Sequence, residues 1–236
     1  MHALVYLLAD SDLVRIIRTA TPEGKMVILT LVIFSIFAWS VMASKAMQMR
    51  RAKRLNRYFE FEFTKQKHVL EIYNRNLAGV TDCPLFMVYQ EGCKELDARL
   101  KMTEERNKRF VSFKGMEHVK RTLERTVAQQ SLKLESGLIL LAIAVSGAPF
   151  LGLLGTVWGV MSAFSYVALQ GHADLKTMAP GVAAALITTV AGLLVAIPSM
   201  FGYNWLVHNL RVFTVNLDNF AQELVSKMET EYLEED

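Results

Sequence analysis

The sequence predicts an all-α membrane protein in which three long transmembrane helices extend into a helical cytosolic domain. The chain has 236 residues, 52% of them hydrophobic, and the apolar residues are concentrated in three long blocks with charged residues between them. A soluble domain would distribute its apolar residues in periodic stripes along each element. Only 5 residues are proline, so long helices can continue, and the chain length fits one helical unit.

The first segment, residues 1–24, is expected to form an amphipathic helix on the periplasmic side. Its apolar run Ala3–Ala9 is short for a bilayer crossing and lacks a positive n-region, so we predict no cleavable signal peptide. Leucine and isoleucine recur at helical spacing here, which favours a helix near the membrane surface. A disordered leader is the alternative.

The first apolar block predicts a transmembrane helix over residues 25–45. No charged residue lies between Lys25 and Lys45. The run Met26–Ser44 has about 19 residues, which is about the length of one bilayer crossing.

The second and third blocks, residues 136–170 and 177–210, are too long for simple crossings. As a helix, each would measure about 50 Å, whereas the hydrocarbon core is about 30 Å thick. Either each helix breaks, or it leaves the bilayer and packs against other protein. Proline can kink a helix, and we expect helix kinks at Pro149, Pro180 and Pro198. A periplasmic link, residues 171–176, joins the two blocks.

Basic residues beside the blocks predict the orientation. Residues 46–135 are basic next to the first and second blocks, whereas the short link has only Lys176. The positive-inside rule therefore places residues 46–135 and 211–236 in the cytosol, with the N-terminus and the link outside. The C-terminal segment is predicted to be a helix with a solvated acidic tail. Its heptad-like seam predicts a packing face: Phe213, Leu217, Phe220, Leu224 and Met228.

The composition argues against several classes of function. The net charge of +3 is small and shows no basic and aromatic clustering, so no nucleic-acid partner is expected. Cys83 and Cys93 lack further ligands at zinc spacing and are expected to be free thiols in a cytosolic loop. His172 and His208 have no matching acid nearby, so we predict no enzyme, no metal and no cofactor.

Small and hydroxyl-bearing residues form stripes at helical spacing in the second and third blocks, although neither block contains Asp, Glu, Lys or Arg. Such stripes allow helices to approach closely and to hydrogen bond to each other. Two interpretations stay open at this point: a structural membrane scaffold, or a pathway whose titrating group comes from another chain. Back-bonding of each threonine to its own helix is a further alternative. The predicted pore-lining or helix-packing residues are Gly152, Gly155, Gly159, Ser162, Gly181, Ala184, Thr188 and Gly192.

Two motifs carry a family resemblance. The stretch Ala148–Met161, with the sequence APFLGLLGTVWGVM, resembles a signature of the MotA/TolQ/ExbB proton-channel family. The stretch Ala179–Leu186, followed by Thr189, Gly192 and Ala196-Ile197-Pro198, resembles the second signature. The first apolar block with its basic tail is similar to TolQ. The likeness covers most of the chain and is closest to the TolQ and ExbB branch.

The resemblance implies a concrete assembly. Members form homopentamers around a dimer of single-span partners resembling TolR or ExbD, whose helix supplies the titrating Asp, and a protein similar to TolA or TonB can act further out. Thr156 and Thr189 match the pore-lining threonines of the family. Ala184 occupies the place where TolQ- and ExbB-like sequences usually have Glu, and Trp205 stands where a basic residue is common.

The predicted function is therefore a proton-channel subunit of an inner-membrane motor. Such a motor uses the proton motive force to drive a partner that acts on the periplasm or outer membrane. The alternative is a non-conducting scaffold in the membrane that clusters partner proteins.

Overall fold

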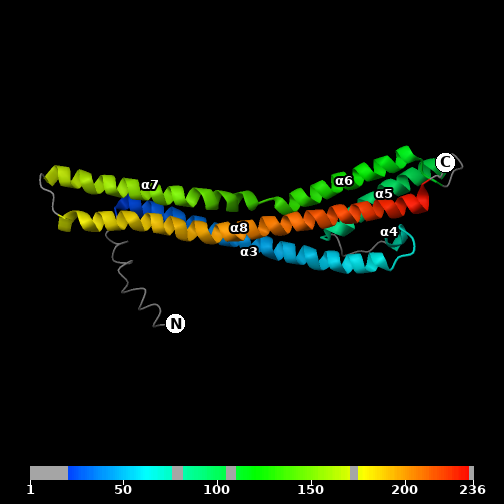
Figure 1. Cartoon of the computed structure of the whole chain (residues 1–236), viewed down its shortest axis with the longest axis horizontal. Helices are drawn as coiled ribbons and strands as arrows, with labels where there is room; N and C mark the ends of the chain where they lie inside the picture. The colour runs from blue at the N-terminus through cyan, green and yellow to red at the C-terminus, as the bar shows by residue number, and fades with distance from the viewer. Residues whose placement is uncertain (1–20, 76–81, 105–109, 171–174, 234–236) are drawn as a thin grey trace, which may run out of the picture. The chain divides into compact units, whose positions relative to one another are not determined.

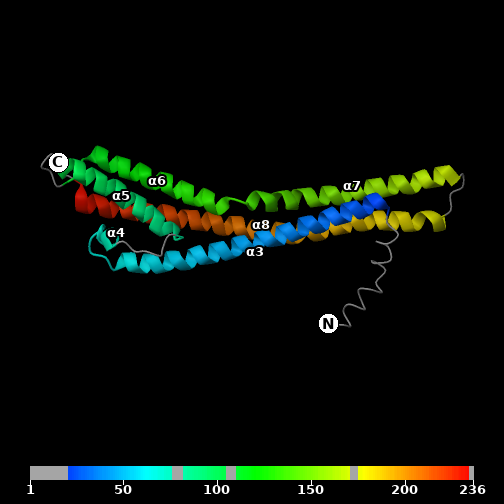
Figure 2. The same cartoon turned by 180° about the vertical axis from the view of Figure 1, so that it is seen from behind.

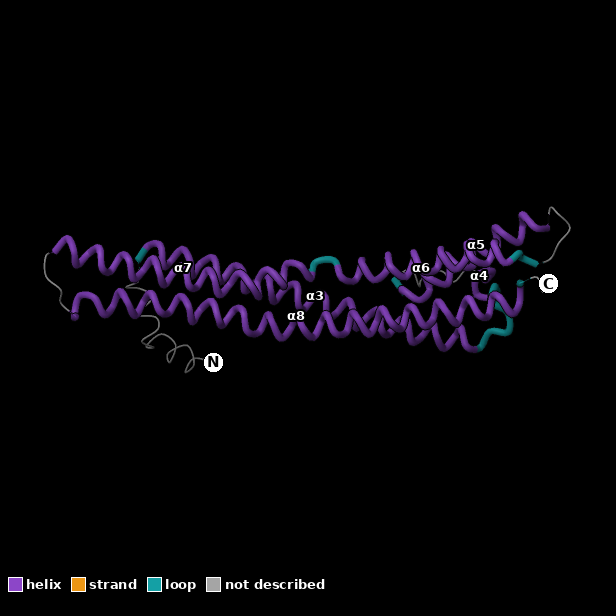
Figure 3. The backbone as a smooth tube through the Cα atoms, turned by 45° about the horizontal axis from the view of Figure 1, so that its top comes forward, coloured by secondary structure: helices purple, strands orange, loops and turns teal. Residues whose placement is uncertain are grey.

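A computed structural model describes residues 21–75, 82–104, 110–170 and 175–233, which are helical almost throughout (Figures 1 and 3). In these ranges no strand forms, and one isolated β-bridge joins Val111 to Leu233. The predicted all-α class is confirmed. The helices are α3 (Pro22–Thr64), α4 (Glu71–Arg75), α5 (Pro84–Glu104), α6 (Phe113–Glu135), α7 (Leu138–Gln170) and α8 (Leu175–Tyr232).

Local sequence signals explain where several helices begin and end. The backbone N–H of Gly24 donates to Thr21 Oγ1 at 3.3 Å just before α3, and Pro22 occupies its first position. Ser112 caps α6 in the same way, accepting from the N–H of Gly115 at 3.3 Å. Gly137 has a φ of 85°, which a residue with a side chain rarely adopts, and it separates α6 from α7.

The chain divides into two compact units. Unit 1 comprises Met1–Ala43 and Gly137–Trp205, and unit 2 comprises Ser44–Ser136 and Leu206–Asp236. Helices α3 and α8 each contribute one part to unit 1 and another to unit 2.

Unit 1 contains the apolar part of each of the three helices that are long and apolar enough to cross a membrane: α3, α7 and α8. Only 11% of the most apolar window of α3 is buried, against 33% for α7 and 28% for α8. Most apolar side chains of these helices therefore face outward from the protomer, as expected for surfaces that meet lipid or other protein. The prediction of three helices that are long and apolar enough to span a membrane is confirmed.

The two overlong blocks form unbroken helices. Helix α7 has 33 residues and α8 has 58, and Pro149, Pro180 and Pro198 lie inside them without interrupting the helical assignment. Neither block is interrupted in the structure: α8 runs on from unit 1 into unit 2, whereas α7 lies in unit 1 throughout. That these helices continue beyond the bilayer stays a prediction. The kinks at the prolines stay predictions.

Unit 2 is a packed helical core. An aromatic cluster formed by Phe59, Phe63, Phe86, Tyr89 and Phe220 has ring centroids 5.0 to 6.4 Å apart. Helices α5 and α6 contact closely where Gly92 faces Leu123. All five seam residues of the C-terminal segment are buried, so the predicted packing face is confirmed.

Some expectations differ from the structure or lie outside it. Most of the amphipathic segment (residues 1–20) and of the link (171–174) lies outside the described residues. Both cysteines are free and buried. Cys83 lies in the connection directly before α5, whereas Cys93 lies within α5 rather than in a loop. The acidic end is not simply solvated, since α8 extends to Tyr232 and the Glu231 carboxylate accepts a hydrogen bond from the N–H of Val69.

Candidate functional site

Helices α7 and α8 approach each other closely along the predicted small-residue stripes, and they run side by side in Figures 1 and 2. A Cβ atom added at Gly152 would lie 2.8 Å from the carbonyl oxygen of Thr188, and one at Gly192 would lie 2.6 Å from that of Ala148. At Gly159 the nearest atom would be the Cβ of Ala185, at 2.6 Å. Glycine is therefore required at these positions for backbone contact between the helices.

Three threonine hydroxyls meet at the centre of this contact, which we call the hydroxyl cluster: Thr156, Thr188 and Thr189. The Thr188 hydroxyl donates across to the carbonyl oxygen of Gly152 at 3.0 Å, and the Thr189 hydroxyl reaches the same oxygen at 3.2 Å. The Thr156 hydroxyl lies 3.1 Å from the carbonyl oxygen of Ala185 on α8 and also hydrogen bonds to Thr189.

The alternative of pure back-bonding does not describe these threonines. Thr156 and Thr188 each have a carbonyl of their own helix within reach, at 3.2 Å and 2.7 Å. Each also has a partner on the opposite helix, and for Thr189 both partners lie on α7. The hydroxyls therefore join the two helices as well as bonding locally.

Exposure separates the three hydroxyl residues. Thr188 is fully buried at 0% exposure, whereas Thr156 and Thr189 are half-buried. The two half-buried threonines are therefore the members of the cluster that retain surface outside the protomer. Thr188 was predicted only among the packing residues, and the structure places it at the centre of the contact.

The remaining predicted residues surround the hydroxyl cluster or continue its stripe. Gly155 faces the side chain of Thr188, and Gly181 faces Ala163 further along the helix pair. Ala184 is buried at 4% exposure, and Ser162 is half-buried. The carbonyl groups of Gly152 and Ala185 complete the cluster. Backbone oxygens carry no residue-specific signal, so the sequence alone did not identify them.

The cluster is polar but uncharged. No Asp, Glu, Lys or Arg occurs in α7 or in the 177–210 part of α8, so no ionisable carboxylate or amine lies in the helix pair. Within the described ranges, no group of three or more His, Cys, Asp or Glu residues is arranged to hold a metal ion. The hydroxyl cluster therefore offers hydrogen bonds, and no carboxylate of this helix pair lies beside it.

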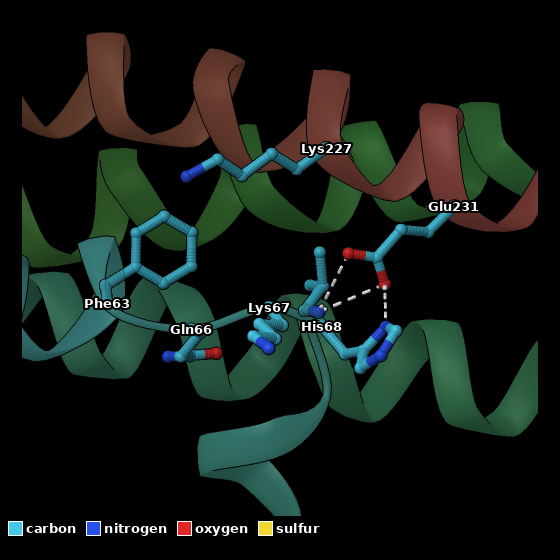
Figure 4. A pocket seen from close by; sticks show the side chains of 7 residues that line it. Phe63, Gln66, Lys67, His68, Lys227 and Glu231 are labelled. Carbon is cyan, nitrogen blue, oxygen red and sulfur yellow. Dashed lines mark hydrogen bonds and ion pairs between the residues drawn. The ribbon is translucent and has the colours of Figure 1, made fainter.

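Unit 2 contains a separate pocket of about 130 Å³, drawn in Figure 4. Both oxygens of Glu231 accept from the N–H of Val69, at 3.1 and 3.2 Å, and His68 Nδ1 lies 3.8 Å from the same carboxylate. Lys227 lies 4.3 Å from the ring centroid of Phe63 and 2.9 Å from Glu223 Oε1. These charges are already paired, so the contacts fasten the last turns of α8 to the segment after α3.

Ionisable groups deeper in unit 2 are structural. Burial raises the pKa of the Cys93 thiol to about 12 and that of the Tyr89 hydroxyl well above its usual range. Tyr89 donates to the carbonyl of Val69 at 2.6 Å and accepts from the N–H of Tyr73 at 3.0 Å. Neither group is prepared for acid–base chemistry at neutral pH.

Comparison with known proteins identifies the family of this chain. The family model described as the MotA/TolQ/ExbB proton channel family matches residues 93–219. The Tol-Pal system protein TolQ of Pseudomonas aeruginosa is 34% identical over 192 residues, 80% of each chain. TolQ of Haemophilus influenzae is 30% identical over 92% of this chain and 94% of its own.

A third relative matches over a shorter stretch. The biopolymer transport protein ExbB of Xanthomonas campestris pv. campestris is 41% identical over 113 residues, 48% of this chain and 45% of that protein. With matches of this extent, and with the paired signature stripes in contact in the structure, the chain belongs to the MotA/TolQ/ExbB proton channel family.

Proposed function

We propose that this protein is the channel-forming subunit of a proton-driven motor of the TolQ–TolR or ExbB–ExbD type in the bacterial inner membrane. The hydroxyl cluster carries the proposal, because it is a polar seam between α7 and the 177–210 part of α8, which contain no Asp, Glu, Lys or Arg. Proton pathways through membranes are usually marked by ionisable residues. In this chain the titrating carboxylate is supplied by a partner with a single membrane span.

Thr156 and Thr189 are the residues that we assign to the pathway. Both residues are half-buried in the protomer, whereas Thr188 is fully buried, so Thr156 and Thr189 are the threonines of the cluster that a partner carboxyl group or a water chain is expected to approach. A hydroxyl both donates and accepts a hydrogen bond, so it can serve the protonated and the ionised forms of a carboxyl group. Thr188, being fully buried, holds the two helices together.

The proposed assembly is a homopentamer around the partner dimer, as the family resemblance implies. The exposed apolar surface of α3, α7 and α8 supports it by leaving faces for contact with lipid and with other subunits. The proposed orientation, with the N-terminus periplasmic and the C-terminus cytosolic, rests on the basic residues beside the apolar blocks. The membrane potential supplies about 2.3 kcal/mol per proton per 100 mV, so several protons are required for each large movement of a TolA- or TonB-like element.

Ala184 leaves the proposed channel without a carboxylate on α8 at this position. Its side chain is buried at 4% exposure, and it provides no carboxylate at the place where TolQ- and ExbB-like sequences usually have Glu. In the proposed channel the partner's carboxyl group therefore meets the hydroxyl cluster and no carboxylate of α7 or of the 177–210 part of α8. A basic residue on the partner that would pair with the usual Glu finds no carboxylate at position 184 of this chain.

Proton uptake into vesicles that contain the protein with its partner tests the proposal. We expect Thr156→Val and Thr189→Val to slow proton flux while the complex still assembles. Thr156→Ser, which keeps the hydroxyl group, should retain the wild-type flux. Thr30→Val is the matched control, because the Thr30 hydroxyl lies in a span and bonds the carbonyl of Met26 at 2.9 Å.

Two results would count against the channel assignment. Wild-type flux in the Thr156→Val, Thr189→Val double variant would remove these residues from the pathway. A cellular phenotype that persists unchanged after the membrane potential is collapsed would instead favour the non-conducting scaffold.

A further inference from the structure

Helix α3 carries an exposed basic face directly after its apolar stretch. Arg50, Lys53, Arg54 and Arg57 are all exposed, and α3 has no acidic residue between Glu23 and Glu60. Of the basic residues from 50 to 57, Arg51 makes the one ion pair found among the described residues, at 2.9 Å from Asp82. The other four therefore present uncompensated positive charge.

Three of these arginines share one side of the helix. At about 100° per residue, Arg50, Arg54 and Arg57 fall within a sector of roughly 60°. With a rise of about 1.5 Å per residue, they lie about 8, 14 and 18 Å beyond Lys45, the first charge after the span. The headgroup layer is roughly 5 to 7 Å thick, so Arg50 lies beside it and Arg54 lies within a side chain's length of it.

The direction of the helix brings these side chains closer to the membrane. The Cα–Cβ bonds of an α-helix tilt toward its N-terminus. In α3 the N-terminal direction is the membrane, because the apolar stretch precedes the basic face. Long basic side chains that extend back along the helix can therefore place their charge among the headgroups.

Lys45 does not belong to this face. Its ammonium group donates to the carbonyl of Leu134 at 3.2 Å and to Gln48 Oε1 at 2.9 Å. It is therefore occupied within unit 2, and it fixes the end of α6 beside the start of the basic face.

We propose that Arg50 and Arg54 bind the phosphate groups of anionic phospholipids in the leaflet where α3 leaves the membrane, and that Arg57 adds positive charge on the same side of the helix. A guanidinium group matches a phosphate with two parallel hydrogen bonds. The alternative occupant is an acidic surface of a neighbouring subunit. We favour lipid because the face continues directly from the membrane span. This proposal rests on the membrane crossing of α3 and does not depend on proton conduction.

The test uses the full chain in phosphatidylcholine bilayers that contain a small fraction of spin-labelled lipid. The selectivity of the protein for phosphatidylglycerol over phosphatidylcholine is measured from the motionally restricted lipid. We expect the Arg50→Gln, Arg54→Gln double variant to lower this preference by about fivefold per arginine, the equivalent of about 1 kcal/mol for each basic residue near the surface. High salt is expected to lower the wild-type preference as well.

The Lys114→Gln, Lys120→Gln double variant is the matched control. It removes the same charge from exposed positions of α6, roughly 20 to 30 Å along that helix from Leu134, whose carbonyl accepts from Lys45 at the start of the basic face. We expect it to keep the wild-type preference, and Arg50→Lys, Arg54→Lys to keep most of it. The proposal is overturned if both glutamine variants behave alike, or if Arg50→Gln, Arg54→Gln changes the oligomer mass and leaves lipid selectivity intact.

Discussion

Replacing Gly152 with alanine tests whether backbone contact between α7 and α8 builds the hydroxyl cluster. The added Cβ would lie 2.8 Å from the Thr188 carbonyl oxygen and 3.0 Å from Thr189 Cα, and ordinary contact begins at 3.4 Å. Both atoms belong to the backbone, so no side-chain rotation can relieve the clash. The helices must separate locally by about 0.6 Å to reach normal contact.

That separation is enough to break the hydrogen bonds to Gly152. The bond from the Thr188 hydroxyl to the Gly152 carbonyl is 3.0 Å long and that from Thr189 is 3.2 Å. Both would lengthen to about 3.6 Å or more, where a hydrogen bond no longer exists. Overpacking costs about 1–3 kcal/mol, and each lost interhelical hydrogen bond costs about 0.6 kcal/mol. The higher helix propensity of alanine than of glycine offsets about 1 kcal/mol of this loss. We expect a net loss of about 1–3 kcal/mol.

Thermal unfolding of the purified full chain in one detergent measures this effect. Gly147→Ala is the control, because a Cβ at Gly147 in the same helix would meet nothing within 4 Å. The control should unfold at or above the wild-type midpoint, and Gly152→Ala below it. Gly192→Ala should behave like Gly152→Ala, since its Cβ would lie 2.6 Å from a carbonyl oxygen. Equal midpoints for Gly152→Ala and Gly147→Ala would refute the close-contact argument.

Two further predictions concern unit 2. Tyr89→Phe leaves the carbonyl of Val69 and the N–H of Tyr73 without their shared buried partner. It should therefore destabilise the chain by about 1–3 kcal/mol and speed amide hydrogen exchange around residues 69–73. Unchanged exchange rates in this segment would contradict the prediction. Because burial raises the Cys93 pKa from 9.0 to about 12, the unfolded chain releases a proton that the folded chain retains, so stability should fall as pH rises from 9 to 12. Cys93→Ser, which removes that ionisation, should flatten the fall in unfolding midpoint over this range.

Much of the membrane part was readable from sequence. The uncharged blocks predicted three spanning helices, and the spacing of Gly152, Gly155 and Gly159 predicted a close helix contact. Both features follow from rules that act on each segment alone, namely the cost of charge in lipid and the size of a side chain. The contact of the two stripes then brought Thr156 and Thr189 together.

The sequence did not reveal which threonine would be central, or how unit 2 is held together. Thr188 and Thr189 are neighbours with the same chemistry, and only the rotation of α8 against α7 makes Thr188 the buried one. The contact of Glu231 with Val69 joins residues 162 positions apart. Local periodicity carries no information on such pairs, so the acidic end of α8 was expected to be solvated.

The absence of charge from the apolar helices bears on how the protein reaches the bilayer. A single Lys, Arg or Asp at the middle of a segment opposes insertion by about 2.5–3.5 kcal/mol, and α7 contains none over its 33 residues. Each segment can therefore partition into lipid as it leaves the translocation machinery, before any other subunit is present. A newly inserted chain can thus remain in the bilayer before the complex assembles, because its apolar segments hold no charged side chain that must be paired.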